Sequence, residues 1–339
     1  MKKIFIFMLF SLIALTLSGV KVADLPGLSK PEKLVLKGDK FYVTEESFVY
    51  VFSMKDFRLL KKYGRRGDGP GELNPQPRYK LFIEACKESI LVNSYSKMVF
   101  LSDLGEYIRE KRIPFVAIQI IPVEQNLAIT KSVISRQGTN SIAVIFYDKE
   151  LNPLKTAYCR QYPHYNKSGK IDMLPSLLLI RRFGDKIFSF DQKGDFVIDV
   201  FNSYGNQIKQ IKIKCKKKKM TKEYIGRTWE WTRKDIRLRT LTDEQRRMVY
   251  FPDHFPYMKN FEVDDNRIYV HTYQMKYDEN RSEFIIIDFQ GKILKRRYFM
   301  GSDINTIECA PYTFKDNKYI HLLENPDTEM IEMHIESAL

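Results

Sequence analysis

Cations and aromatic rings alternate along one long segment of this 339-residue sequence, residues 211–261. Lysines occupy six of the eight positions from 212 to 219, and both tryptophans of the chain follow. Rings interleaved with cations can stack on sugars or attract anionic groups. The same pattern also fits a structural role, in which the lysines form a solvated strand edge and the tryptophans cap the core. The residues selected as binding candidates are Arg227, Trp229, Trp231, Arg233, His254 and Tyr257.

A second candidate is the ten-residue stretch GRRGDGPGEL, residues 64–73. A phosphate loop would need Lys-Ser/Thr and a helix after its glycines, and neither follows here. Arg66-Gly67-Asp68 has the form of an adhesion motif, but three-residue matches often arise by chance. Glycines that can adopt positive φ, a proline of fixed φ and a glutamate that can accept hydrogen bonds from amides are typical of a tight structural turn. The stretch therefore predicts a joint between repeated units, with Arg65 and Arg66 on the rim as further binding candidates.

Patterns that indicate metal binding or catalysis are sparse. The five histidines, at positions 164, 254, 271, 321 and 334, form no His-x-His or His-x3-His pair. Asp191 and Asp195 in DQKGD look like half of a calcium site, but the run of ligands of a calcium loop is missing and a hairpin turn fits better. No Gly-x-Ser-x-Gly elbow is present. We therefore predict no catalytic residue, no metal ligands and no cofactor, with calcium as the one cation left open.

The first 19 residues have the layout of a secretory signal peptide. Lys2 and Lys3 precede an apolar run from Ile4 to Leu17, which is shorter than the ~20 residues that a membrane-spanning helix needs. An uncleaved N-terminal anchor is the alternative. Lipoprotein processing after Gly19 would need cysteine next, and residue 20 is valine. We expect an exported protein, periplasmic or extracellular, that is not lipid-anchored at Val20 and has no transmembrane span after signal cleavage.

Charge and cysteine content narrow the choice of partners. The net charge is +14 at pH 7, and loss of Lys2 and Lys3 with the signal leaves +12. A basic exported protein suits anionic cell-surface polymers, acidic glycans or lipid headgroups, and export argues against nucleic acid. The cysteines at 86, 159, 215 and 309 are scattered and lack Cys-x-x-Cys spacing. One or two disulfides and four buried free thiols both stay open, and the sequence does not decide the oligomeric state.

A phrase of three strands separated by turns recurs along the chain. Its copies begin at residues 38, 87, 126, 184, 265 and 316, so the intervals are 49, 39, 58, 81 and 51 residues. Most lie near the ~40–50 residues of a four-stranded propeller blade. In FVYVFSM, the side chains of Val49, Val51 and Ser53 are expected on one face, and those of Phe48, Tyr50 and Phe52 on the other.

The repeat predicts an all-β fold, a six-bladed β-propeller of four-stranded antiparallel blades, as a single domain over residues 20–339. The long interval places an insertion, about residues 212–255, between blades 4 and 5. There, Thr242-Asp-Glu-Gln245 has capping-box spacing for a short helix through about Met248. The chain ends within four residues of the strand Met330–Ile335, which leaves no room for a last outer strand. We therefore expect Val20–Ala23 to pair with that strand and close the ring.

The phrase KKYGRRGDGPGELNPQP, followed by ILVNSYSKMVFLSDLGEYI, resembles the NHL-type repeat. It is similar to exported bacterial six-bladed propeller proteins of the NHL-repeat-like or TolB-like kind. The residues that match the turn of that pattern are Gly64, Gly67, Gly69, Pro70, Gly71 and Glu72. Leu73 replaces the usual aromatic residue, Pro75 or Pro77 fills the later proline position, and the other five junctions depart from the pattern. The resemblance implies a propeller in an extracytoplasmic setting and no particular activity.

Two classes of function follow. The first is a non-catalytic binding or scaffold module for a protein, a glycan or an anionic polymer. The alternative is a propeller enzyme, a metal-dependent hydrolase, lactonase or lyase with its site at the central channel. Three or more Asp, Glu, Asn or His side chains converging on the channel floor would favour the enzyme. A cleft walled by Trp229, Trp231 and several arginines would favour binding.

Overall fold

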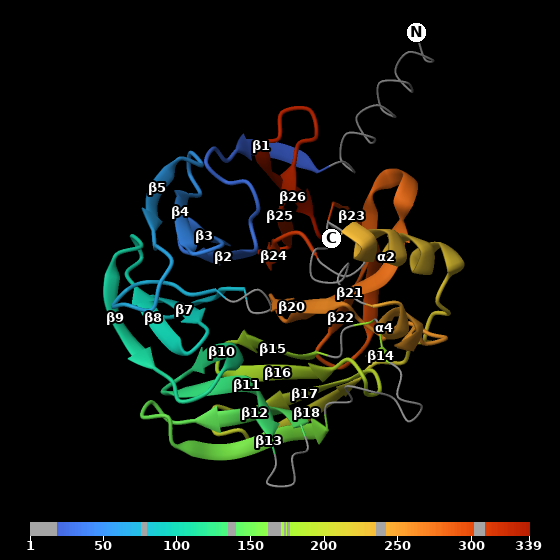
Figure 1. Ribbon diagram of the computed structural model, residues 1–339, viewed down its shortest axis with the longest axis horizontal. Coiled ribbons are helices and arrows are strands. Elements are labelled where there is room, and N and C mark those ends of the chain that lie inside the picture. The colour runs from blue at the N-terminus through green and yellow to red at the C-terminus, as the bar shows by residue number, and fades with distance from the viewer. Residues whose placement is uncertain are drawn as a thin grey trace.

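The computed structural model describes residues 19–75, 80–134, 140–161, 171–172, 174, 177–234, 242–301 and 309–339. Six four-stranded antiparallel sheets are arranged as blades around a common centre (Figure 1). This arrangement confirms the predicted six-bladed β-propeller. The predicted signal segment, apart from Gly19, lies outside the described residues.

The strands of each blade follow one another in chain order from the centre outwards, except that the outermost strand of the last blade comes from the N-terminus. Blade 1 consists of β2 (Lys33–Lys37), β3 (Lys40–Glu45), β4 (Phe48–Ser53) and β5 (Leu59–Tyr63), and blade 2 of β6 (Phe82–Ala85), β7 (Ile90–Ser94), β8 (Lys97–Leu101) and β9 (Tyr107–Arg112). Blade 3 consists of β10 (Ala117–Val123), β11 (Asn126–Ile134), β12 (Asn140–Tyr147) and β13 (Pro153–Gln161), and blade 4 of β15 (Leu178–Phe183), β16 (Lys186–Asp191), β17 (Val197–Phe201) and β18 (Gln207–Lys212). Blade 5 consists of β20 (Asn260–Asp264), β21 (Arg267–Lys276), β22 (Arg281–Asp288) and β23 (Ile293–Met300), and blade 6 of β24 (Tyr312–Lys315), β25 (Lys318–Glu324), β26 (Ile331–Ser337) and β1 (Val20–Asp24).

The side chains of β4 alternate between the two faces of blade 1, as predicted. Tyr50 and Phe52 pack in the apolar core that blade 1 shares with blade 6. Val49 and Val51 pack in the core shared with blade 2. Each face of the sheet therefore buries apolar side chains against a different neighbour, which is why period-2 patterning specifies blade-to-blade packing.

The N-terminal strand completes blade 6. β1 runs antiparallel to β26, with Val20 opposite Ile335. Just beyond β1, the amide of Leu25 donates to the Ile331 carbonyl oxygen at 2.8 Å, and the Leu25 side chain is fully buried. The expected pairing of the two chain ends is thus confirmed, and it gives blade 6 four strands like the other blades.

The innermost strand of each blade lies outside the recurring sequence phrase. In chain order these strands read KLVLK, FIEA, AIQIIPV, LLIRRF, NFEVD and YTFK. They are short, and most carry charged or amide side chains among apolar ones. In Figure 1 they surround the centre of the ring. They therefore supply the walls of the central channel.

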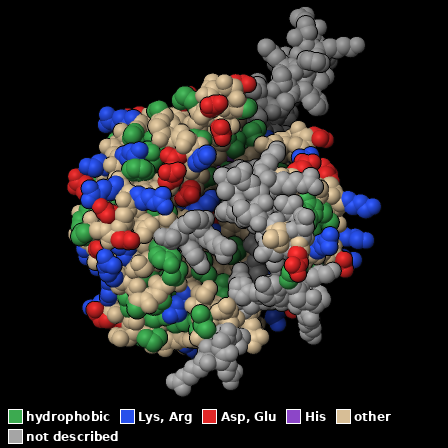
Figure 2. Space-filling model, viewed as in Figure 1, with side chains coloured by type: hydrophobic (Ala, Val, Ile, Leu, Met, Phe, Trp, Pro, Cys, Tyr) green, Lys and Arg blue, Asp and Glu red, His purple; other side chains and the backbone are tan. Residues whose placement is uncertain are grey.

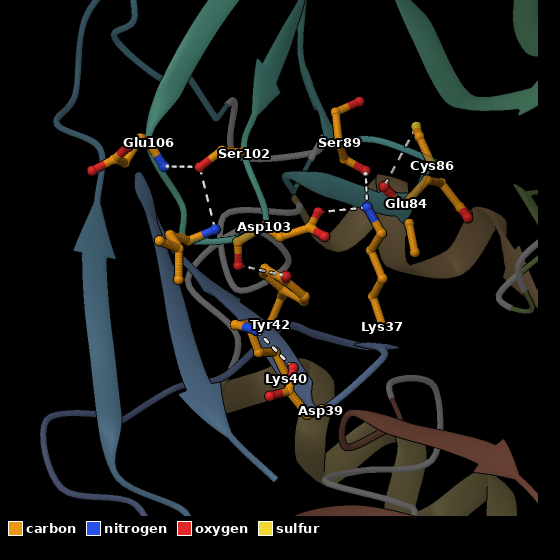
Figure 3. A network of polar contacts seen from close by, with 12 residues as sticks. Lys37, Asp39, Lys40, Tyr42, Glu84, Cys86, Ser89, Ser102, Asp103 and Glu106 are labelled. Carbon is orange, nitrogen blue, oxygen red and sulfur yellow. Dashed lines mark hydrogen bonds and ion pairs between the residues drawn. The ribbon is translucent and has the colours of Figure 1, made fainter.

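The hairpin turn of one blade packs against the neighbouring blade. Gly105 in blade 2 has a φ of 76°, and a Cβ atom there would lie 2.7 Å from Cγ2 of Val51 in blade 1. In the same turn, the carbonyl oxygen of Asp103 accepts a hydrogen bond from the Tyr42 hydroxyl at 2.8 Å, and its carboxylate pairs with Lys37 (Figure 3). The glycine thus lets the turn approach blade 1 closely enough for these polar contacts.

The described residues of the insertion between blades 4 and 5 include the helices α2 (Lys222–Lys234) and α4 (Asp243–Met248). α4 confirms the predicted short helix, whereas α2 was not predicted. The short strand β19 (Val249–Tyr250) pairs in parallel with β14 (Ile171–Asp172). A 3-10 helix (Tyr277–Glu279) lies in the β21–β22 hairpin. Within the described ranges, no helix combines the length and apolar content that crossing a membrane requires.

Candidate binding sites

Arg65 and Arg66 lie in the junction between blades 1 and 2. The carboxylate of Glu72 accepts a hydrogen bond from the amide of Gly69 at 2.8 Å and pairs with Arg65 at 2.6 Å. Arg66 is exposed, and its backbone forms a β-bridge with Leu73. The turn is therefore held by its own glutamate, as the sequence predicted.

Contacts at the remaining residues of this turn explain its composition. Gly64 has a φ of 113°, and a Cβ atom there would lie 2.3 Å from the carbonyl oxygen of Ser47, so only glycine fits. The Asp68 carboxylate accepts a hydrogen bond from the Asn74 side-chain amide at 2.7 Å. Arg112 donates to the Asp68 carbonyl oxygen at 3.1 Å. These contacts support the interpretation of the stretch as a blade junction.

Helix α2 is attached to blade 5 by aromatic packing. The buried ring of Tyr224 contacts Phe255 edge-on, with ring centroids 4.7 Å apart. Thr221 is the N-cap of α2: its Oγ1 accepts a hydrogen bond from the Tyr224 amide at 3.1 Å. One buried face, formed by Tyr224 and Thr228, thus fixes the direction of the helix.

The binding candidates on α2 are only partly available to a ligand. Arg227 lies over the ring of Tyr277, 4.2 Å from its centroid. Trp229 is half-buried and packs edge-on against Phe251 at 5.8 Å. The side chains of Trp231 and Arg233 lie outside the described part of the chain. Arg227 and Trp229 therefore each engage an aromatic side chain of the protein itself.

The lysines that precede α2 form a continuous basic surface, named here the lysine stretch: Lys212, Lys214, Lys216, Lys217, Lys218 and Lys219. Ile211 and Ile213 point into the core between blades 4 and 5, so the alternating lysines must point outwards. All six lysines are exposed. Over the described residues, no carboxylate forms an ion pair with any of them.

The backbone of the lysine stretch is held by the end of the insertion. The Lys218 carbonyl oxygen accepts a hydrogen bond from the Phe255 amide at 3.0 Å, and Lys219 forms a β-bridge with His254. The Lys217 ammonium lies 5.0 Å from the ring centroid of Tyr257. The structure therefore brings the candidates His254 and Tyr257 to the lysine stretch. Arg65 and Arg66 lie at the opposite side of the ring, three blade junctions away.

A cavity of about 240 Å³ lies at the innermost strands of five blades. The face in Figure 2 is hollowed near the centre of the ring. The residues that line the cavity are Glu32 to Leu36, Phe82 to Glu84, Arg181, Arg182, Asn260, Glu262 and Cys309 to Lys315. None of them is among the sequence candidates. Each of these strands contributes two to four of the lining residues, and only closure of the ring brings them together.

Arg181 is the most strongly bonded cation of the channel. Its Nε donates to the Glu262 carboxylate at 2.8 Å, its Nη2 to the Asn260 side-chain oxygen at 2.6 Å, and its Nη1 to its neighbour's carbonyl, Ile180, at 2.8 Å. Its side chain is 12% exposed and that of Glu262 24% exposed. Burial lowers the pKa of Arg181, but the nearby Glu262 more than compensates and raises it. Arg181 is therefore a charged, fixed part of the wall.

Glu84 lies close to this pair without an ion pair of its own among the described residues. Burial raises the pKa of Glu84 to about 7, against the opposing effect of Arg181 and Arg182. Arg182 donates to two backbone carbonyl oxygens, those of Pro122 and Ala85. A carboxyl that titrates near neutral pH inside a cavity is typical of functional sites.

Replacing Glu84 with glutamine is expected to stabilise the protein at pH 8 and to change little at pH 5. The folded-state pKa of Glu84, about 7, exceeds the ordinary value of 4.5, so the folded protein holds this proton more tightly. The stability that this group contributes is complete below pH 4.5 and is lost as the pH rises through 7. The gain of Glu84→Gln at pH 8 is up to about 3 kcal/mol. Urea denaturation at both pH values measures it, and an equal effect at both would contradict the shifted pKa.

The enzyme alternative requires side chains that can hold a metal ion. No group of three or more His, Cys, Asp or Glu side chains able to hold a metal ion occurs among the described residues.

The sulfur of Cys309 lies 3.5 Å from Nδ1 of His271, which is fully buried. All four cysteines are free thiols. The disulfides that the sequence left open are therefore not formed.

A family model described as a 6-bladed beta-propeller, DUF5128, matches residues 26–224. Two solved structures of Bacteroides proteins share the fold. A Bacteroides fragilis protein whose name calls it exported is 13% identical, with 95% of this chain and 94% of that chain covered and a TM-score of 0.58. A member of the DUF4221 family from Bacteroides vulgatus is also 13% identical, with 95% and 98% covered and a TM-score of 0.54. No curated protein matches the sequence.

Proposed function

Because this chain belongs to that six-bladed β-propeller family, we propose that it is an exported binding module retained on an anionic cell-surface polymer by the lysine stretch. The observation that carries the proposal is that six exposed lysines follow one another on a single segment, with no carboxylate paired to any of them over the described residues. Export is supported by the signal-like residues 1–19 and by the name of the Bacteroides fragilis relative in fold.

The way the stretch is held favours binding over a loose solvated tail. Its backbone is held at Lys218 and Lys219 by contacts with the end of the insertion, so the lysines stay on one face of the propeller's surface. Lysines elsewhere on the propeller, such as Lys37 and Lys193, are paired with acids. Unpaired cations on a fixed surface bind polyanions without first breaking an internal ion pair. His254 and Tyr257 border this surface and supply a polar and an aromatic contact.

The proposal is tested by replacing Lys216, Lys217, Lys218 and Lys219 with glutamine and measuring retention on immobilised heparin over a salt series. The variant is expected to elute at lower salt. Each lysine that contacts the polymer contributes about one unit to the slope of log affinity against log salt concentration, so the slope is expected to fall by up to about 4. Because the changes lie outside the core, the melting temperature is expected to stay the same.

A charge-matched control separates a local surface from net charge. Lys55, Lys61, Lys87 and Lys318 are exposed and spread over blades 1, 2 and 6. Their replacement with glutamine removes the same four charges. Retention is expected to change much less than in the lysine-stretch variant. Equal losses of retention in both variants would refute the proposal. Unchanged retention of the lysine-stretch variant, together with new aggregation, would also refute it and would favour a role for the lysines in protecting the strand edge.

A further inference from the structure

Two hydrogen-bond donors at the channel cavity have nothing to bind. Lys33 makes no ion pair within the described ranges, and its ammonium lies 4.7 Å from the ring centroid of Phe82. The Tyr312 side chain is 7% exposed, and its hydroxyl has no hydrogen-bond partner. Both residues line the same cavity. A buried donor without a partner costs free energy, so the Tyr312 hydroxyl needs an explanation, and the partly buried Lys33 ammonium lines the same cavity.

The other cations of the cavity are already engaged. Arg181 uses all three of its nitrogen atoms on Glu262, Asn260 and a carbonyl oxygen. Arg182 uses both terminal nitrogens on carbonyl oxygens. One free ammonium and one free hydroxyl suit a group with a single negative charge and two acceptor atoms.

We propose that the channel cavity binds a small organic carboxylate, whose oxygen atoms accept hydrogen bonds from the Lys33 ammonium and the Tyr312 hydroxyl. The rings of Phe82, Phe314 and Tyr312 line the cavity and suit a compact, partly apolar body. The volume of about 240 Å³ limits the ligand to a small molecule. This site is separate from the lysine stretch, so it stands or fails independently of the proposed function.

The titratable and charged groups around the cavity give the proposal a pH signature. Those that line it are Glu32, Lys33, Glu84, Arg181, Arg182, Glu262, Cys309, Tyr312 and Lys315. Burial and the nearby Arg181 lower the pKa of Lys33, and a bound anion would reverse that effect. Since the pKa of Glu84 is about 7, its negative charge opposes an anion at pH 8 and is mostly removed at pH 6. A carboxylate is therefore expected to bind more tightly at pH 6 than at pH 8.

The test is calorimetric titration of the purified protein with benzoate and with benzamide, which share a ring and differ in charge. Acetate, succinate and glucuronate extend the carboxylate set, and sulfate tests a different oxyanion. At least one carboxylate is expected to bind with a Kd below about 10 mM, at least tenfold more tightly than benzamide binds. Binding of none of these carboxylates below that limit, or equal binding of benzoate and benzamide, would overturn the proposal. So would sulfate binding more tightly than every carboxylate.

Two substitutions assign the site. Lys33→Met and Tyr312→Phe are each expected to weaken carboxylate binding about tenfold, since each removes one donor to a charged acceptor. Tyr312→Phe is also expected to raise the melting temperature of the free protein, because it deletes a hydroxyl that has no partner. A variant that loses binding while melting higher cannot have lost it by misfolding. Lys55→Met, on an exposed turn, is the control and should bind normally; unchanged affinity in both site variants would refute the assignment.

Discussion

A chain that begins at Leu25, and so lacks strand β1, is expected to lose at least about 4 kcal/mol of its free energy of unfolding. The truncation removes the ladder between β1 and β26 together with the partly buried Val22 and Ala23, and so uncovers the side of the core between blades 6 and 1 against which they pack. It also turns β26 into a free edge. Urea denaturation measures the loss, and size-exclusion chromatography is expected to show association through the exposed edge.

Two controls separate strand pairing from the loss of a single contact. A chain that begins at Val20, the expected mature start, keeps β1 and is the reference for stability. Lys21→Met keeps the strand and removes only the ion pairs of a lysine that is 44% exposed, those with Asp24 and Glu332, and is expected to cost far less than the truncation. If the chain that begins at Leu25 stays monomeric and keeps the same urea midpoint, the ring does not depend on β1 for closure.

Replacing Arg181 with methionine is the second change with a large expected effect. The substitution leaves Glu262 in the channel wall without its cation and removes the donor that Asn260 accepts from. Breaking a buried pair by removing one partner costs about 3–5 kcal/mol, because the remaining charge is uncompensated. Urea denaturation at neutral pH measures the change in the free energy of unfolding.

A double-mutant cycle shows whether this cost comes from the pair. Arg181→Met combined with Glu262→Met is expected to recover much of the stability that the single variant loses, since two apolar side chains then replace the pair. Arg182→Met is a matched control, because the hydrogen bonds of this cation within the described residues go to carbonyl oxygens and not to a carboxylate. Its expected cost is about 1–3 kcal/mol. Strictly additive effects of the Arg181 and Glu262 changes would contradict the proposed coupling.

The outer three strands of blades 1 to 5, and β25 and β26 of blade 6, could be predicted from the sequence because short turns join them. Turns such as the one at Gly105 need special residues, and those residues punctuate the chain at each blade. The innermost strands could not be identified in the same way. They are short, their sequences do not resemble one another, and irregular connections precede them. Helix α2 was missed because its buried face consists of Tyr224 and Thr228, set among charged residues.

The channel site was hidden from the sequence for a related reason. Lys33, Glu84, Arg181 and Glu262 are far apart along the chain, and none belongs to a recognisable sequence motif. The one available signal was a charged residue inside a short apolar run, as in FIEA or NFEVD. The two conspicuous sequence segments differ in what the structure says of them. GRRGDGPGEL is a blade junction, and the binding role of the lysine-rich segment is still a proposal.

The pairing of β1 with β26 also constrains when this protein can finish folding. Val20 meets Ile335 across nearly the whole length of the chain, so blade 6 cannot be completed until the last residues have been synthesised. Until then, blades 1 to 5 can form from neighbouring segments, while β1 has no partner. Joining the ends carries the largest loop-closure entropy of any contact in the molecule and favours a late, ring-closing step. Until blade 6 is complete, the unpaired backbone groups of β1 can hydrogen-bond to a strand of another chain or to a chaperone.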